Sequence, residues 1–239
     1  MDNSNALPIS GPLDILRKVS PALERYTTEV LIGDVWRRPQ LSARDRSILT
    51  LSVLIARNQS EQMPDYLDAA LDQGVKPGEI AEMIAHLAFY SGWANAVAAA
   101  KVVQPVFERR GVQAGLLPPG DARLLPVNRP AEDRRHRVVK RKFGEVAPGL
   151  VQITQDVIFQ DLWLRPDLSP RDRCLVTICS VIATAQTAQL AFYLNRAMDH
   201  GVSRAELSEL MTHLAFYSGW SSVYTALAVA KEVFESRPD

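Results

Sequence analysis

The chain has 239 residues, 47% of them hydrophobic, and its 27 Lys and Arg are balanced by 27 Asp and Glu. This length and composition fit one large or two small globular domains with a substantial core. A net charge of zero argues against a nucleic-acid or membrane partner bound through bulk charge, and no apolar run reaches the roughly 18 residues of a membrane span. We interpret the basic run RRHRVVKRK (134–142) as a solvated helix face, with nucleic-acid contact as the minor alternative.

The N-terminus and the cysteines both favour a cytoplasmic protein. The opening MDNSNALPISGPLDILRK lacks the basic and apolar stretches of a signal peptide. Cys174 and Cys179 would point about 140° apart on a helix, because each residue turns the helix by about 100°. We therefore expect no disulfide between them, which fits a reducing compartment.

A sequence of about 75 residues, starting at residue 34, returns 127 positions later without an insertion. Matched pairs include Asp34 and Asp161, Trp36 and Trp163, Tyr66 and Tyr193, and Phe107 and Phe234, and the octapeptide HLAFYSGW occurs at 86–93 and again at 213–220. The period is too long for a solenoid unit and indicates a duplicated domain of about 100 residues. We predict a first repeat over 1–110, a Pro/Gly-rich linker over 111–133 and a second repeat over 134–239.

The first repeat is predicted to form helices in the following order. Ser42 is a good N-cap for a helix through RSILTLSVLIA, which is apolar almost all round and so buried. A second helix is expected from about Ser60 to Gly74, the residue that follows its C-terminus. A third is expected to start near Glu79 and to continue through HLAFYSGW to Glu108. Nothing alternates with period two, so the predicted fold class is all-α.

A histidine, a tyrosine and a tryptophan of each octapeptide are spaced to share one helix face. They are His86, Tyr90 and Trp93 in the first repeat and His213, Tyr217 and Trp220 in the second. One interpretation is an aromatic core stripe with a hydrogen-bonded core histidine, which is the commoner arrangement. The other is the wall of a ligand pocket with a polar tip. Duplication preserves core and site residues alike and does not decide between them.

The run LSARDRSILTLSVLIA, then SEQMPDYLDAALDQGV and EIAEMIAHLAFYSGWANAVAAAKVV, resembles the carboxymuconolactone decarboxylase family, within the alkylhydroperoxidase-like superfamily. The second repeat resembles it at least as well. The resemblance implies a small all-helical unit that assembles into trimers or hexamers, with pockets between helices and at interfaces and with neither metal nor organic cofactor. For a fused pair of units it implies a homo-oligomer, with a trimer favoured and a dimer possible, acting on a small-molecule substrate.

Several positions depart from the family's patterns. Glutamines Gln59, Gln62, Gln186 and Gln189 stand where the peroxidase branch has its Cys-x-x-Cys, and Ser47 and Cys174 stand where that branch has a glutamate. Without a thiol pair there is no disulfide cycle, so thiol peroxidase chemistry is excluded. Of the decarboxylase branch's Glu and His, the first repeat keeps Glu61 but has Tyr66 for the histidine, and the second has Ala188 and Tyr193.

The tyrosines change the chemistry that the resemblance implies. A phenol is a poor base at neutral pH but can donate a hydrogen bond to a developing oxyanion, so Tyr66 and Tyr193 are candidate catalytic donors. His86 and His213 are candidates for the proton relay that a histidine can provide. Glu61 is either a buried general acid or base, or a carboxylate that merely favours the first turn of its helix.

Arginines next to the first predicted helix could hold a substrate carboxylate bidentately. The candidates are Arg46 and Arg173, with Arg44 and Arg171 beside them. Structural ion pairs with Asp45 or Asp172 are the preferred alternative. We expect Glu61, Tyr66, His86 and Trp93 to line one pocket in the first repeat, with the second repeat as the weaker half.

Two functions follow from these candidates. The first is a cofactor-free enzyme on a small lactone, enolisable acid or polyketide-like substrate. It would decarboxylate, isomerise or cyclise that substrate through an enolate-like intermediate. The alternative is a non-catalytic binding or scaffold protein that kept the fold and lost the chemistry. A histidine or glutamate within hydrogen-bond reach of Tyr66 and Tyr193 would favour the enzyme, and a surrounding of apolar side chains would favour the scaffold.

Overall fold

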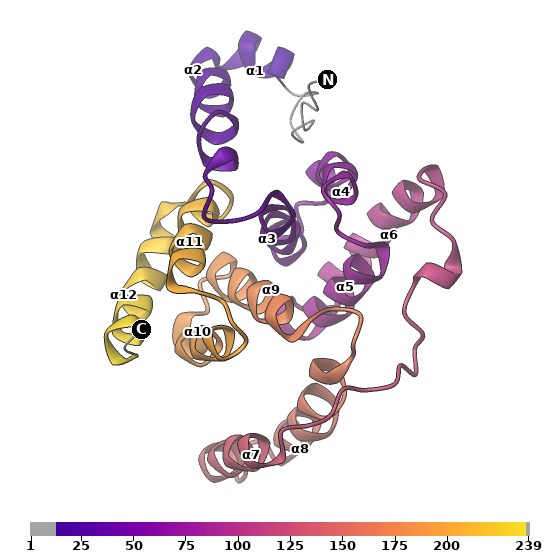
Figure 1. Cartoon of the computed structure of the whole chain (residues 1–239), viewed down its shortest axis with the longest axis vertical. Helices are drawn as coiled ribbons and strands as arrows, with labels where there is room; N and C mark the ends of the chain where they lie inside the picture. The colour runs from indigo at the N-terminus through magenta and orange to yellow at the C-terminus, as the bar shows by residue number, and fades with distance from the viewer. Residues whose placement is uncertain (1–12, 238–239) are drawn as a thin grey trace.

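A computed structural model describes residues 13–237 as two sets of helices (Figure 1). The first repeat contains α1 (Leu13–Val19), α2 (Pro21–Arg25), α3 (Ala43–Ala56), α4 (Met63–Asp72), α5 (Pro77–Ser91) and α6 (Trp93–Arg109). The second contains α7 (Arg129–Phe143), α8 (Pro148–Ile153), α9 (Pro170–Ala183), α10 (Leu190–Asp199), α11 (Arg204–Ser218) and α12 (Trp220–Ser236). The described part of the chain has no strand, so the all-α prediction is confirmed. None of its helices is long and apolar enough to cross a bilayer.

The helices α3 and α9 lie against each other at the centre of the molecule. α3 begins as predicted, because the hydroxyl of Ser42 accepts a hydrogen bond from the Asp45 amide. α9 begins in the same way, with the hydroxyl of Ser169 accepting a hydrogen bond from the Asp172 amide. Almost every residue of both helices is buried, as a segment that is apolar all round requires. Cys174 and Cys179 on α9 are buried and unpaired, as expected.

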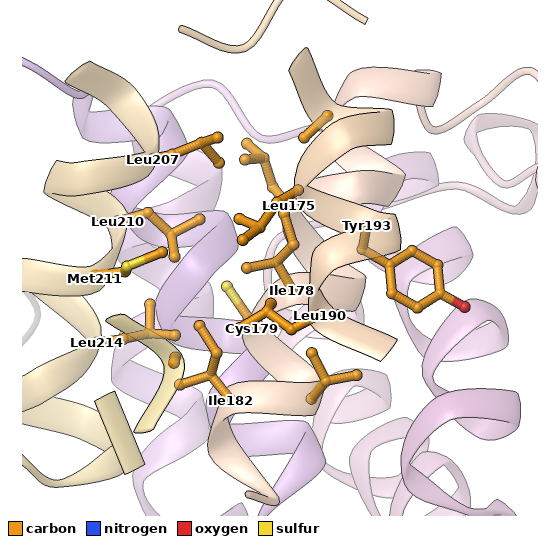
Figure 2. Close-up of a cluster of buried hydrophobic side chains, with 14 of the residues drawn as sticks. Leu175, Ile178, Cys179, Ile182, Leu190, Tyr193, Leu207, Leu210, Met211 and Leu214 are labelled. Atoms are coloured by element: carbon orange, nitrogen blue, oxygen red, sulfur yellow. The ribbon is translucent and has the colours of Figure 1, made fainter. Parts of the chain in front are cut away.

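The two repeats interlock through α5 and α11, each of which contacts helices of both repeats. α5 of the first repeat packs on α9 of the second, and α11 of the second packs on α3 of the first. One core cluster therefore combines Leu49 and Val53 with residues of α9, α10 and α11. Figure 2 shows part of this cluster, with aliphatic side chains of α9 and α11 facing each other and the Tyr193 ring turned away from them. Each of the two core clusters is formed mainly by one repeat and completed by residues of the other.

Two arms leave apolar side chains exposed. One consists of α1, α2 and the π-helical segment Tyr26–Ile32, and the other of α7, α8 and the π-helical segment Thr154–Phe159. Figure 1 shows them at opposite ends of the molecule. Equivalent positions are exposed in both, namely Val19 and Val146, Leu23 and Leu150, and Tyr26 and Ile153. Matched apolar surfaces of this kind are typical of contact faces.

The long helix predicted through HLAFYSGW is wrong, because the chain breaks at Gly92. Gly92 has φ 97° and ψ 149°, and its counterpart Gly219 has φ 88° and ψ 148°. This region is essentially restricted to glycine, so the turn between α5 and α6 depends on it. Trp93 consequently starts a new helix and does not share the face of His86 and Tyr90.

Replacing Gly92 by alanine should lower the free energy of unfolding by about 1–3 kcal/mol, since a side chain is strained at this backbone conformation. No atom lies within 4 Å of the added Cβ, so the loss would be conformational rather than steric. Urea unfolding measures it. Gly149→Ala is the matched control, because that glycine is also open but has an ordinary φ. Equal stability of Gly92→Ala and the wild type would contradict the assignment.

Candidate functional site

Two buried polar clusters lie where the repeats meet, and each takes residues from both. The Trp36 cluster comprises Trp36, Arg38, Arg46, Thr50 and Tyr66 of the first repeat with Glu209, His213 and Tyr217 of the second. The Trp163 cluster comprises Trp163, Arg165, Arg173, Thr177 and Tyr193 of the second repeat with Glu82, His86 and Tyr90 of the first. Every member of one cluster has its sequence-repeat counterpart in the other.

A pair of phenols forms the centre of each cluster. In the Trp163 cluster, the Trp163 indole donates to the Tyr90 hydroxyl at 2.8 Å and the Tyr193 hydroxyl donates to it at 3.0 Å. The Tyr90 oxygen therefore accepts two hydrogen bonds, which leaves its own proton for a third partner. No described residue accepts that proton. In the Trp36 cluster, Tyr217 accepts in the same way from Trp36 and Tyr66, at 2.9 and 3.3 Å.

His86 is fully buried and held at both ring nitrogens. Its Nδ1 lies 3.4 Å from an Arg173 Nη, and its Nε2 lies 2.8 Å from the Thr177 hydroxyl. Thr177 uses its own proton on the Arg173 carbonyl, so the geometry assigns the neutral tautomer with the proton on Nε2. Burial, and then the Arg173 charge, holds the pKa of His86 well below its ordinary value.

His213 has the matching environment in the Trp36 cluster. It contacts Arg46 at 3.4 Å and Thr50 at 2.9 Å. Burial, followed by the charge of Arg46, lowers the pKa of His213 to about 3. Both histidines are therefore neutral at physiological pH.

The buried arginines pair with glutamates of the opposite repeat, not with the predicted aspartates. Arg173 donates to Glu82 at 2.7 Å, and Arg165 donates to both oxygens of the same carboxylate. Burial would raise the pKa of Glu82, but the hydrogen bonds from Arg165 and Arg173 outweigh it and hold that pKa below its ordinary value. Arg46 pairs with Glu209 at 2.9 Å in the same way.

The neighbouring arginines do form ion pairs with aspartates, and they do so across the repeat boundary. Arg44 contacts Asp172 at 2.9 Å, and Arg171 contacts Asp45 at 3.0 Å. These pairs fix α3 against α9 at their N-terminal ends. Their guanidinium groups are thus engaged structurally, as the preferred alternative had it.

The pocket predicted in the first repeat is not assembled. Its expected members were Glu61, Tyr66, His86 and Trp93. Tyr66 belongs to the Trp36 cluster, whereas His86 belongs to the Trp163 cluster, because α5 packs on the other repeat. Glu61 is exposed in a 3-10 turn, so the burial that its acid–base role required is missing. Trp93 and Trp220 lie beyond the helix break and are 64% and 54% exposed, so they form no pocket wall with the buried residues of the same chain.

The two clusters differ in charge. Arg196, on α10 one turn after Tyr193, places its guanidinium carbon 4.3 Å from the centroid of the Trp163 ring. The matching position in the first repeat is Ala69, so the Trp36 cluster has no such cation. Arg196 also reaches Glu132 of α7 at 3.5 Å. Glu132 lines a cavity of about 230 Å³ together with Leu164, the neighbour of Trp163.

Sequence reasoning missed the tryptophans, threonines and glutamates of the two clusters. All of them recur at the repeat offset, and this recurrence was the available signal. Arg196 and Ala69 give the opposite signal, a difference between otherwise matched positions. Among residues 13–237, no group of three or more His, Cys, Asp or Glu side chains is placed to hold a metal ion.

Comparison with known proteins assigns the family. The sequence model of the carboxymuconolactone decarboxylase family matches residues 21–105 and 148–232. The chain therefore belongs to the carboxymuconolactone decarboxylase family, as a tandem pair of its domains.

Three similar proteins extend this assignment. A 4-carboxymuconolactone decarboxylase of Acinetobacter baylyi is 28% identical over 104 residues, 44% of this chain and 78% of that protein. A nitrosuccinic acid decarboxylase of Metarhizium robertsii is 35% identical over 81 residues, 34% of this chain and 57% of that protein. A solved structure of a proposed gamma-carboxymuconolactone decarboxylase subunit from Burkholderia xenovorans shares the fold. Its TM-score is 0.61 at 17% identity, over 95% of this chain and 92% of that one.

The buried histidines should make the protein less stable in acid. In the unfolded chain a histidine gains a proton below about pH 6.5, whereas folded His86 and His213 stay neutral, so stability is lost as pH falls below that value. Each should contribute about 1.4 kcal/mol per pH unit well below pH 6.5. Urea unfolding between pH 5 and 7 measures the slope, and His213→Gln should reduce it. An unchanged slope in this variant would contradict the neutral assignment.

Proposed function

We propose that this chain is a cofactor-free decarboxylase of a small carboxylic acid whose carboxylate lies next to an electron-accepting group. Family membership supports this proposal, as do the names of two relatives, which both specify decarboxylation of a small acid. The observation that carries it is the Tyr90 hydroxyl, which accepts from Trp163 and Tyr193 and keeps its proton for a ligand.

The reaction needs an oxygen to take up charge. The bond to the carboxylate carbon breaks, carbon dioxide leaves, and the electron pair moves through the remaining carbon onto a carbonyl or nitro oxygen. A proton from water then returns to that carbon. Tyr90 would donate its hydrogen bond to this oxygen, where a preorganised donor lowers the barrier. Burial raises the pKa of Tyr90 despite the bonds from Tyr193 and Trp163, so the phenol keeps its proton.

Decarboxylation is a better fit than the isomerisation or cyclisation that the same enolate would also permit. Those reactions start by removing a proton from carbon, which requires a base. Both ring nitrogens of His86 are engaged, and Tyr90 and Tyr193 have raised pKa values. The Glu82 carboxylate is bound by Arg165 and Arg173, so the described residues of the Trp163 cluster offer no free base. Loss of carbon dioxide requires no base. We therefore propose that His86, stacked 4.8 Å from Tyr90, positions the phenol rather than relaying a proton.

Tyr90→Phe should lower kcat by about 10²–10³-fold, the cost of removing one oxyanion donor. Release of carbon dioxide from 4-carboxymuconolactone and from nitrosuccinate is the measurement. Tyr217→Phe removes the equivalent hydroxyl of the Trp36 cluster, and comparison of the two variants shows which cluster works. Tyr224→Phe changes an exposed tyrosine and is the control. Full activity in both cluster variants would contradict the donor role, and no activity in the wild type would favour the binding or scaffold alternative.

We further propose a homotrimer in the cytoplasm, with a dimer as the other closed assembly. The exposed Trp93 and Trp220 and the apolar arms support self-association, because matched apolar faces occur on both repeats. Light scattering at micromolar concentration should give the mass of three chains. Trp93→Ser combined with Trp220→Ser should shift the mass downward, whereas Lys101→Ser on the exposed face of α6 should not. A wild-type monomer would contradict the proposal.

A further inference from the structure

Arg196 is the main chemical difference between the two clusters. It follows Tyr193 by three residues on α10, so both side chains project from the same side of the helix. Its charge bears on His86, Tyr90 and Tyr193, all of which lie in the Trp163 cluster. The first repeat has Ala69 at this position, a residue that is 5% exposed and carries no charge.

The guanidinium of Arg196 has unused hydrogen-bonding capacity. Its contact with Glu132 is 3.5 Å long, compared with about 2.7–2.9 Å for a strong charge-assisted bond. Glu132 makes its shorter bond, 2.7 Å, to Arg135 instead. The Arg196 Nε is buried without a hydrogen-bond partner. By comparison, Arg173 holds Glu82 at 2.7 Å with no exposed surface.

A small acid could reach Arg196 by exchanging with Glu132. The Arg196 side chain is 21% exposed, so it is partly open to solvent. Glu132 also lines the cavity of about 230 Å³ described above, which lies between the linker, α7 and the segment after α8. The Glu132 carboxylate thus contacts the arginine at the place where an external carboxylate could replace it.

We propose that Arg196 binds a carboxylate of the substrate in exchange for Glu132, and that the Trp163 cluster is consequently the working member of the pair. This rests on the proposed function only for what happens to the acid after it binds.

The cation would bind the carboxylate that is retained and not the one that is lost. A carboxylate that leaves as carbon dioxide loses its charge in the transition state, so pairing it with Arg196 would stabilise the ground state and raise the barrier. A retained carboxylate keeps its charge throughout and can anchor the molecule without this cost. The substrate class is therefore an acid with at least two carboxylates, one next to the electron-accepting group and one held by Arg196.

The indole signals of the four tryptophans provide a test that does not depend on turnover. Succinate serves as an unreactive dicarboxylate probe, and Trp163→Phe assigns the relevant signal in a ¹⁵N spectrum. Succinate should shift the Trp163 signal and leave that of Trp36 in place. Arg196→Gln should weaken this response about 10–100-fold, the loss expected for one charged hydrogen-bond partner. Glu132→Gln should strengthen it, because it removes the competing charge.

Controls separate binding from folding. Arg237, which follows α12, pairs with Asp199 on α10, the helix that carries Arg196. Arg237→Ala should leave the response unchanged. The three other indole signals report whether each variant remains folded. No shift of Trp163 in the wild type up to about 10 mM succinate, or an equal shift in Arg196→Gln, would overturn the proposal, since a site of about 1 mM affinity would then be occupied.

Kinetics distinguish this proposal from the proposed function. If a dicarboxylic acid is turned over, Arg196→Gln should raise its KM at least tenfold, with a smaller change in kcat. Turnover that is insensitive to Arg196→Gln would refute the anchor and leave the decarboxylase intact. A Trp163 response without turnover of either named acid would refute the reaction and leave the carboxylate site.

Discussion

The pairing of a buried arginine of one repeat with a glutamate of the other is the interaction on which both clusters depend. Arg173 with Glu82 and Arg46 with Glu209 are nearly or fully excluded from solvent. Removing one partner of such a pair leaves an uncompensated buried charge, which typically costs 3–5 kcal/mol. The repeats can therefore separate only if these charges become exposed to solvent or lose their partners. This constraint requires α5 and α11 to pack against the opposite repeat as well as their own, and the clusters exist only as a result.

The same arginines determine the chemistry of the histidines. Each arginine donates a hydrogen bond to the Nδ1 of a buried imidazole. The ring is therefore held neutral, and its unprotonated nitrogen is not available to accept a proton. A histidine that looks like a proton carrier in sequence is thereby part of the scaffold that orients a tyrosine. The polar groups that remain for a ligand are hydroxyl protons and, in the Trp163 cluster, a guanidinium. These groups stabilise negative charge, which is what a reaction that expels carbon dioxide requires.

Local and periodic features were predictable from sequence, and tertiary ones were not. Ser42 and the helix after it follow from capping and from an apolar run, both of which act within a few residues. The contact of Tyr66 with Tyr217 joins positions 151 residues apart, and no local pattern encodes it. The break at Gly92 was missed because the apolar periodicity continues through it, while only the backbone angle shows the turn. Assigning each site to a single repeat was the error that followed.

Fusion of two units into one chain is what permits the clusters to diverge. In a symmetric dimer of identical units, an arginine gained at one site appears at both, together with its cost in packing and charge. A duplicated chain can place Arg196 in one cluster and keep Ala69 buried in the other. The Trp36 cluster then retains the full hydrogen-bonded frame of Tyr217, His213 and Arg46, which holds the repeats together. The Trp163 cluster, supported by that frame, is free to carry the charge that selects a substrate.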